Sequence, residues 1–293
     1  MKFTRITGNR TAEEIVREYC KEQAELQINE PKKEKPRAEP IKADPASLSE
    51  LFILSHDDYG KELIAKSNAL FAGTHAEIPV QGLADNAEIP NMHLLKRLAL
   101  ITAISRDSQL NSYKAFPITP LESEQLLQLN KLPGDPSTYW EDLGLILYDK
   151  SIKGKNPREA RALYESIKEH KTDLRLSRSD LEEKLLIVNA GLDTDADMPH
   201  GVKPIILPGI TLVYPHETLK QTGKNHKFTY GLQEGLPSPS ELGTGSRTLH
   251  MPSENTDIGL RVLYRYRDLV LSAWLELLAD SDSDGRVVCA RRK

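Results

Sequence analysis

Apolar and polar residues alternate along the last part of the chain. The even positions from 262 to 272 read Val262, Tyr264, Tyr266, Asp268, Val270 and Ser272, and the odd positions carry arginine, leucine and alanine. Successive side chains of a strand point to opposite faces, so this pattern predicts one strand over 259–273 with two chemically different faces. A second strand is expected over 286–290. From Tyr266 onward the even face mixes an aromatic ring, an acid and a hydroxyl, which suits a surface that meets a ligand.

Apolar residues at three- and four-residue intervals predict helices earlier in the chain. Helices are expected at 11–28, 48–72 (one or two short helices), 91–104, 119–129, 156–170 and 179–186. Two of them carry start signals, a capping box from Thr119 to Glu122 and an Asn156-Pro157 pair at a helix entry. Residues 139–148 fit a buried strand or a short helix, with Trp140 as a core anchor. After Leu186 the pattern changes to short strands and turns.

These elements predict an α+β protein in three parts. Residues 1–46 hold a short helix and a mobile linker rich in proline and charge, and residues 47–93 form a helical N-terminal extension. The main domain is expected over 94–293. A chain of 293 residues is long enough to bury a sizeable core in this way.

Composition narrows the partners of this chain. Its net charge of -4 provides no basic excess to neutralise phosphates, so no nucleic-acid partner is expected.

No apolar run approaches the length needed to cross a bilayer and the first ten residues are polar, so neither membrane insertion nor a signal peptide is expected. Cys20 and Cys289 lie far apart in the sequence, which favours free thiols over a disulfide.

Catalytic and metal-binding motifs are weak. The run from Asp280 to Gly285 matches the first half of an EF-hand loop, but its twelfth position is Arg291 where calcium requires a glutamate. The eight histidines are scattered, and no zinc spacing, nucleophile elbow or phosphate-binding loop is present. We therefore expect no enzyme activity, cofactor or metal. The alternative is a calcium-dependent lectin or enzyme that uses the loop from Asp280 to Asp284.

A repeated set of residue types runs through the segment 264–285. Each member can be encoded by a codon that differs from the asparagine codon AAC only at the adenines. Trp274 and Glu276 cannot be encoded in this way. They are Tyr266, Asp268, Val270, Ser272, Leu275, Leu277, Asp280, Asp282 and Asp284. The segment resembles the variable region of a diversity-generating retroelement target protein, in which adenine-directed mutagenesis rewrites the end of a C-type lectin fold. The ending is similar to archaeal and archaeal-virus members of that group, which are distantly related to the formylglycine-generating enzyme family.

The resemblance implies a fold and a function. It implies a C-type lectin-like domain over 94–293 with its variable region at about 264–285. The nine residues would then form a hypervariable ligand-binding surface for a macromolecular partner, a protein or a surface glycan. It also implies receptor binding from a virion or a cell surface, although the sequence itself leaves the localisation unknown. An amphipathic terminal hairpin with a solvated face remains the plainer interpretation.

A scaffold that tolerates such substitution needs other residues to hold its core. The inward set is expected to comprise Leu269, Leu271, Ala273, Trp274, Leu278 and Val287. The arginines at 261, 265, 267 and 286 are unusual neighbours for that core, so partly buried ion pairs are expected, with Glu254 or Asp257 as candidate partners.

Overall fold

The computed structural model describes residues 47–80, 86–149, 154–221, 225–252, 259–266, 269–275, 277–280 and 283–293. The chain divides into two compact units, Met1–Lys42 and Ala43–Lys293. All that follows concerns the second unit. The helix expected at 11–28 and the linker after it lie outside the described residues.

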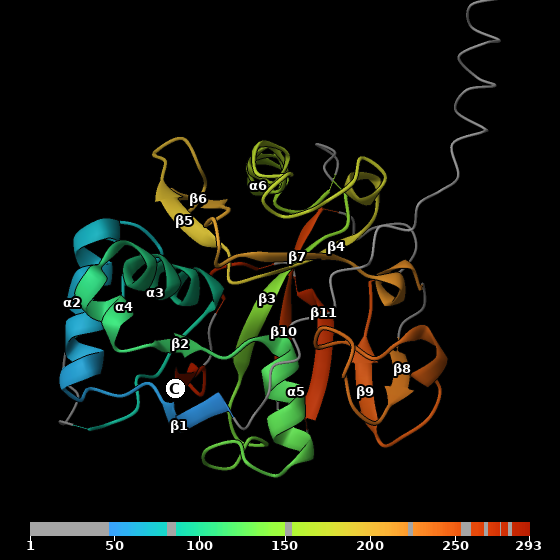
Figure 1. Ribbon diagram of the computed structural model, residues 1–293, viewed down its shortest axis with the longest axis horizontal. Helices are drawn as coiled ribbons and strands as arrows, with labels where there is room; N and C mark the ends of the chain where they lie inside the picture. Colours follow the sequence, from blue (N-terminus) through green and yellow to red (C-terminus); the bar gives the residue numbers. More distant parts are fainter. Residues whose placement is uncertain are drawn as a thin grey trace, which may run out of the picture. The chain divides into compact units, whose positions relative to one another are not determined.

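A seven-stranded mixed sheet forms the centre of the second unit (Figure 1). Its strands follow the order β7-β4-β3-β10-β11-β9-β8. Neighbours are antiparallel except for β11 and β9, which run parallel. The bounds are β3 Glu141–Leu147, β4 Leu185–Val188, β7 Leu212–Pro215, β8 Asn225–Phe228, β9 Arg247–His250, β10 Leu260–Tyr266 and β11 Val270–Leu275.

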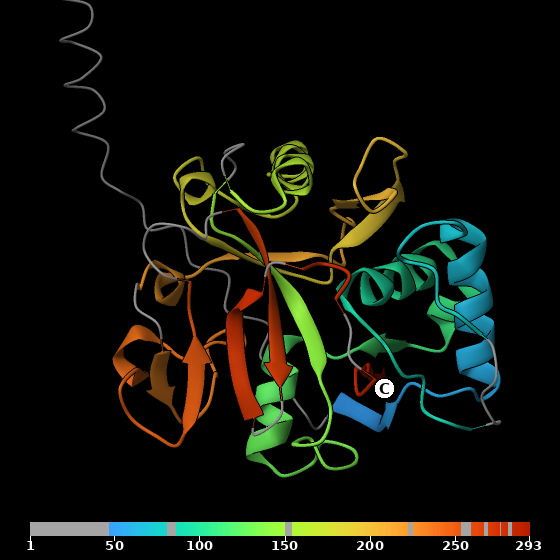
Figure 2. The same cartoon turned by 180° about the vertical axis from the view of Figure 1, so that it is seen from behind.

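Two smaller sheets accompany it. In the first, β12 (Val288–Arg292) lies between β1 (Leu48–Ile53) and β2 (Ala115–Pro117), so segments from both ends of the described chain meet. The second is a hairpin of β5 (Gly191–Thr194) and β6 (Val202–Ile205). Seen from behind, β10 and β11 lie between β3 and the pair formed by β8 and β9 (Figure 2).

The helices confirm several local signals. They are α2 Asp58–Phe71, α3 Leu94–Arg106, α4 Ser108–Ser112, α5 Pro120–Gln128 and α6 Pro157–Glu169, with 3-10 turns η2 Asp180–Glu182, η3 Glu217–Lys220 and η4 Pro239–Glu241. The expected capping box opens α5, where the Thr119 side chain and Glu122 satisfy each other's backbone N–H groups. None of the helices in the described residues is long and apolar enough to cross a membrane.

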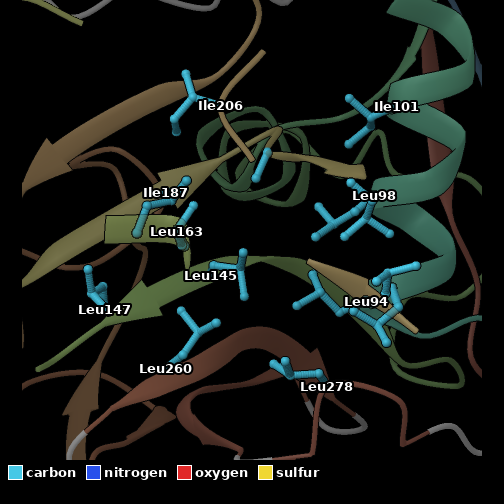
Figure 3. Close-up of a cluster of buried hydrophobic side chains, with 14 of the residues drawn as sticks. Leu94, Leu98, Ile101, Leu145, Leu147, Leu163, Ile187, Ile206, Leu260 and Leu278 are labelled. Carbon is cyan, nitrogen blue, oxygen red and sulfur yellow. The ribbon is translucent and has the colours of Figure 1, made fainter. Parts of the chain in front are cut away.

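Both faces are buried at the middle of the central sheet, where every residue of β3 is buried. On one face Leu145 and Leu260 pack beneath α3 and α6, which contribute Leu98 and Leu163 (Figure 3). The opposite face is covered by a second cluster that includes Ile146, Leu186, Leu263 and Leu271. The position of β10 is therefore determined by cores on both sides.

Three expected elements are wrong, two of them because strand pairing overrides a helical preference. Residues 48–53 form β1, which pairs with β12, and the helix there begins only at Asp58. Of the helix expected at 179–186 only η2 forms, because Leu185 and Leu186 enter β4. The single strand expected over 259–273 is two antiparallel strands, β10 and β11.

Candidate ligand-binding site

The β10–β11 hairpin separates two sets of side chains. Its register pairs Tyr264 with Ser272, Arg265 with Leu271, and Tyr266 with Val270. Residues opposite each other in an antiparallel pair share a face, so the even-numbered residues lie on one face and Arg265 with Leu271 on the other. The expected separation of odd and even positions is therefore present from Tyr264 to Ser272, although the chain reverses between 266 and 270. Beyond it a register shift places the odd-numbered Leu275 opposite Val262.

The odd face is part of the protein core. Leu263, Leu271 and Ala273 are fully buried in one cluster, as expected for Leu271 and Ala273. Leu278 and Val287 are also buried, while Leu269 is only half-buried and adopts a left-handed conformation with φ 59°. The side chain of Trp274 lies outside the described part of the chain. The other face also contributes to a core, because Val262 is buried in the first cluster and Tyr264 and Leu275 pack against it.

Arg265 is fully buried and is paired. Its Nη2 donates to Glu141 Oε2 at 2.9 Å and its Nη1 to Ser123 Oγ at 2.7 Å. Burial raises the pKa of Glu141, against the opposing effects of Arg265 and Arg97. Replacing either partner alone would leave a charge in a dry core. A buried ion pair was expected at this arginine.

The described partners of Arg265 and Arg286 are not the residues named for that role. The residues proposed for that role, Glu254 and Asp257, lie outside the described residues, as does Arg267. Arg265 pairs instead with Glu141 of β3, and Arg286 Nε donates to Glu88 Oε2 at 2.8 Å. Both partners are remote in sequence, so spacing along the chain provided no signal for them.

The nine candidate residues do not share one degree of exposure. Leu277 is 54% exposed and Asp280 is also exposed, whereas Tyr266, Val270, Leu275 and Asp284 are half-buried. Ser272 is 0% exposed and departs from the outward position expected for the whole set. Tyr264 lies opposite Ser272 in the register and is hydrogen-bonded to it. Asp268 and Asp282 lie outside the described residues.

Three aromatic rings gather beside these residues. Trp140 stacks on Tyr264 with ring centroids 4.5 Å apart and an interplanar angle of 12°. Tyr266 stands nearly perpendicular to Trp140 at 5.4 Å. Trp140 is buried, as expected of a core anchor, but it also supports the two half-buried tyrosines. Tyr264 and Trp140 are thus site residues that the sequence set omits. The even position of Tyr264 was a usable signal, and none existed for Trp140.

Asp142 holds the tryptophan in place. Trp140 Nε1 donates to Asp142 Oδ1 at 2.8 Å, and the carboxylate is 5% exposed. Burial raises the pKa of Asp142 to about 7, while the bond from Trp140 and the charge of Arg97 act in the opposite direction. The site therefore contains, next to Trp140, a buried carboxyl group whose pKa is near neutral pH.

The acidic loop is tied to the same tryptophan. Trp140 N donates to the carbonyl of Asp284 at 3.1 Å, and Arg286 N donates to the carbonyl of Trp140 at 2.8 Å. The main chain before and after Gly285 is thus fixed against the start of β3. Across the described ranges, which omit Asp282, no group of three His, Cys, Asp or Glu side chains forms a ready metal site.

Comparisons with known proteins find no matching family model, no curated protein with significant similarity and no similar solved structure.

Proposed function

We propose that this chain is a ligand-binding protein with a C-type lectin-like fold, whose hypervariable surface is generated by a diversity-generating retroelement. The observation that carries the proposal is the division of the β10–β11 hairpin. Arg265 and Leu271 are fully buried on one face, while Tyr266 and Val270 are half-buried on the other. A scaffold of this kind tolerates variation on one face while the core on the other remains constant.

The chemistry of the outward residues supports recognition of a macromolecule. Tyrosine offers a large amphipathic contact area with few rotatable bonds, and the exposed Leu277 and Asp280 add apolar and charged contacts beside it. Burial of Ser272 removes it from the contact surface, and Tyr264 takes a place there. We propose a protein or surface glycan as the ligand, bound by a chain displayed on a virion or a cell surface.

The gene sequence tests the retroelement part of the proposal. We expect the codons for residues 266, 268, 270, 272, 275, 277, 280, 282 and 284 to end in C. We also expect a near-repeat of this region, with asparagine codons at the corresponding places, downstream and next to a reverse transcriptase gene. Codons without this bias, or the absence of such a repeat, would contradict the retroelement origin but not binding as such.

Selection of binders tests the surface itself. Peptides selected from a random display library on the full chain should lose at least about tenfold in affinity when Val270 and Leu277 are both changed to serine. Leu129→Ser is the matched control, because Leu129 is 49% exposed at the end of α5. Binders that tolerate the double change, or that are weakened equally by the control, would show that recognition occurs elsewhere.

A further inference from the structure

Arg247 of β9 contacts the main chain of the hairpin. Its Nε donates to the carbonyl of Leu269 at 2.8 Å, immediately before β11 begins. Strand β9 runs parallel to β11, and the register that pairs Leu249 with Leu271 places Arg247 beside Leu269, two residues earlier in each case. Arg247 is not one of the nine candidate residues, so it lies outside the set that is proposed to vary.

The guanidinium group of Arg247 is held from two sides. Its Nη1 and Nη2 donate to the two carboxylate oxygens of Glu124 in α5 at 2.5 and 2.8 Å, which is the bidentate geometry of a strong arginine–carboxylate pair. The group also lies over the ring of Phe228, 4.5 Å from its centroid. Gly231 N donates to the same carboxylate at 2.8 Å. Arg247 is 7% exposed and Glu124 0% exposed, so water has little access to this pair.

Leu269 adopts a main-chain conformation that needs support. Its φ of 59° lies in the left-handed region, which is unfavourable for a residue with a Cβ atom. Such a conformation persists where neighbouring contacts impose it. The hydrogen bond from Arg247 to the Leu269 carbonyl is a contact of this kind, and it comes from a strand outside the hairpin.

Helix α5 is joined to three strands in this way. Three consecutive residues near its start each accept a hydrogen bond from an arginine of a different strand. The pairs are Glu122 with Arg292 of β12, Ser123 with Arg265 of β10, and Glu124 with Arg247 of β9. Strands β10 and β9 are the two neighbours of β11. Both are therefore tied to α5 by contacts that substitution of the nine candidate residues does not remove.

We propose that Arg247 is a positioning residue for the ligand-binding surface, an inference that rests on the function proposed above. By holding the Leu269 carbonyl, it keeps the hairpin in one main-chain conformation whichever side chains occupy positions 266 and 270. A surface that is ordered before binding loses less conformational entropy when its ligand binds, so its affinity is higher. Without this contact Leu269 relaxes toward an ordinary φ, and the outward side chains beside it change direction.

Arg247→Lys tests the proposal, because lysine keeps the charge but cannot form the bidentate pair and the bond to Leu269 together. Peptides whose binding depends on Val270 and Leu277 should lose at least about tenfold in affinity for this variant, measured well below its melting temperature. Peptides selected for dependence on Val80, which is 53% exposed beyond α2, should bind it as they bind the wild type. A general loss of stability would not separate the two groups of peptides.

Arg292→Lys is the matched control. It alters an arginine–glutamate pair on the same helix, since Arg292 Nη2 donates to Glu122 Oε1 at 2.6 Å, but β12 belongs to another sheet. Main-chain amides of residues 269–272 should exchange their hydrogens at least about tenfold faster in Arg247→Lys than in the wild type. Exchange there should be unchanged in Arg292→Lys, with the amides of β3 as the internal reference in each protein.

A measurement on the wild type covers the case in which Arg247→Lys does not fold. The Nε proton of Arg247 should exchange with water at least about tenfold more slowly than that of Arg106, whose side chain is 42% exposed. Rapid exchange of this proton would overturn the inference. So would peptides that depend on Val270 and Leu277 but bind Arg247→Lys as tightly as the wild type, and the proposed function would then still stand. Peptides indifferent to Val270 and Leu277 would contradict the proposed function instead, and the exchange rates would still decide whether Arg247 holds Leu269.

Discussion

Ser272 and Val270 have neighbouring even positions in β11 but different environments. Ser272 is fully buried and Val270 is half-buried. Ser272→Leu should lower the free energy of unfolding by about 1–3 kcal/mol through overpacking, while Val270→Ser should cost less than about 1 kcal/mol. Urea denaturation of the two variants measures the difference.

Leu271→Ala is the reference for a core position on the opposite face. It should cost about 2–5 kcal/mol, because it leaves a cavity in a fully buried cluster. Leu277→Ser should resemble Val270→Ser, because Leu277 is 54% exposed. Equal losses at Val270, Leu277 and Leu271 would mean that the two faces are not distinguished as described.

The raised pKa of Asp142 should make the stability of the protein depend on pH. Its pKa in the folded protein is about 7, raised from an ordinary value of 3.8. Between these two values only the unfolded chain releases the proton, so the contribution of Asp142 to stability is lost as pH rises from about 4 to about 7. Relative to the wild type, Asp142→Asn should therefore gain about 2 kcal/mol between pH 5 and pH 7.

Unfolding free energies at the two pH values test this expectation. Asparagine keeps an oxygen that accepts from Trp140 Nε1, so the variant preserves the contact that orients the indole. Asp280→Asn at the exposed end of the site is the control and should show no such change. A difference of the opposite sign would place the carboxyl group in its charged form in the folded protein.

Helix α5 shows how far a local signal determines an element. Both hydrogen bonds of the capping box between Thr119 and Glu122 are present. Thr119→Ala should lower the free energy of unfolding by about 1 kcal/mol, and Thr119→Ser, which keeps the hydroxyl, should not. Thermal denaturation of the pair makes the comparison. A similar loss in both variants would point to the threonine methyl group instead of the cap.

Helix α6 begins at the expected place for a different reason. Asn156 has φ 49° and its side chain donates to the carbonyl of Leu260 at 2.8 Å, so it does not cap the helix. Pro157 at the first helical position and the buried stripe of Ala160, Leu163 and Ile167 remain as expected. The start of the helix was predicted correctly, but Asn156 contributes to it through a tertiary contact with Leu260 and not as a helix cap.

At the scale of the whole molecule, β1 completes the sheet that holds β12. Leu54 and Leu63, which lie before residue 94, are buried in one cluster with Val287 and Cys289. A fragment comprising 94–293 should therefore fail to fold, while one comprising 43–293 should unfold cooperatively, as measured by circular dichroism during heating. A cooperative transition in the shorter fragment would show that the core does not need β1 and α2.

Short-range signals determined part of this protein from sequence alone. The capping box placed α5, the apolar stripe placed α6, and alternation along the hairpin separated the buried Arg265 and Leu271 from the half-buried Tyr266 and Val270. Each signal acts between residues within a turn of helix or along one strand, where the spacing in sequence determines which side chains lie on the same face. The candidate surface residues Tyr266, Val270 and Leu277 were accessible to prediction for this reason.

Contacts between distant segments were decided by the tertiary structure. The pairing of β1 with β12, the ion pair of Arg265 with Glu141, the position of Trp140 under Tyr264 and the burial of Ser272 all join residues far apart in sequence or depend on such neighbours. A linear pattern contains the chemistry of each side chain, but only the folded chain determines which of them become neighbours.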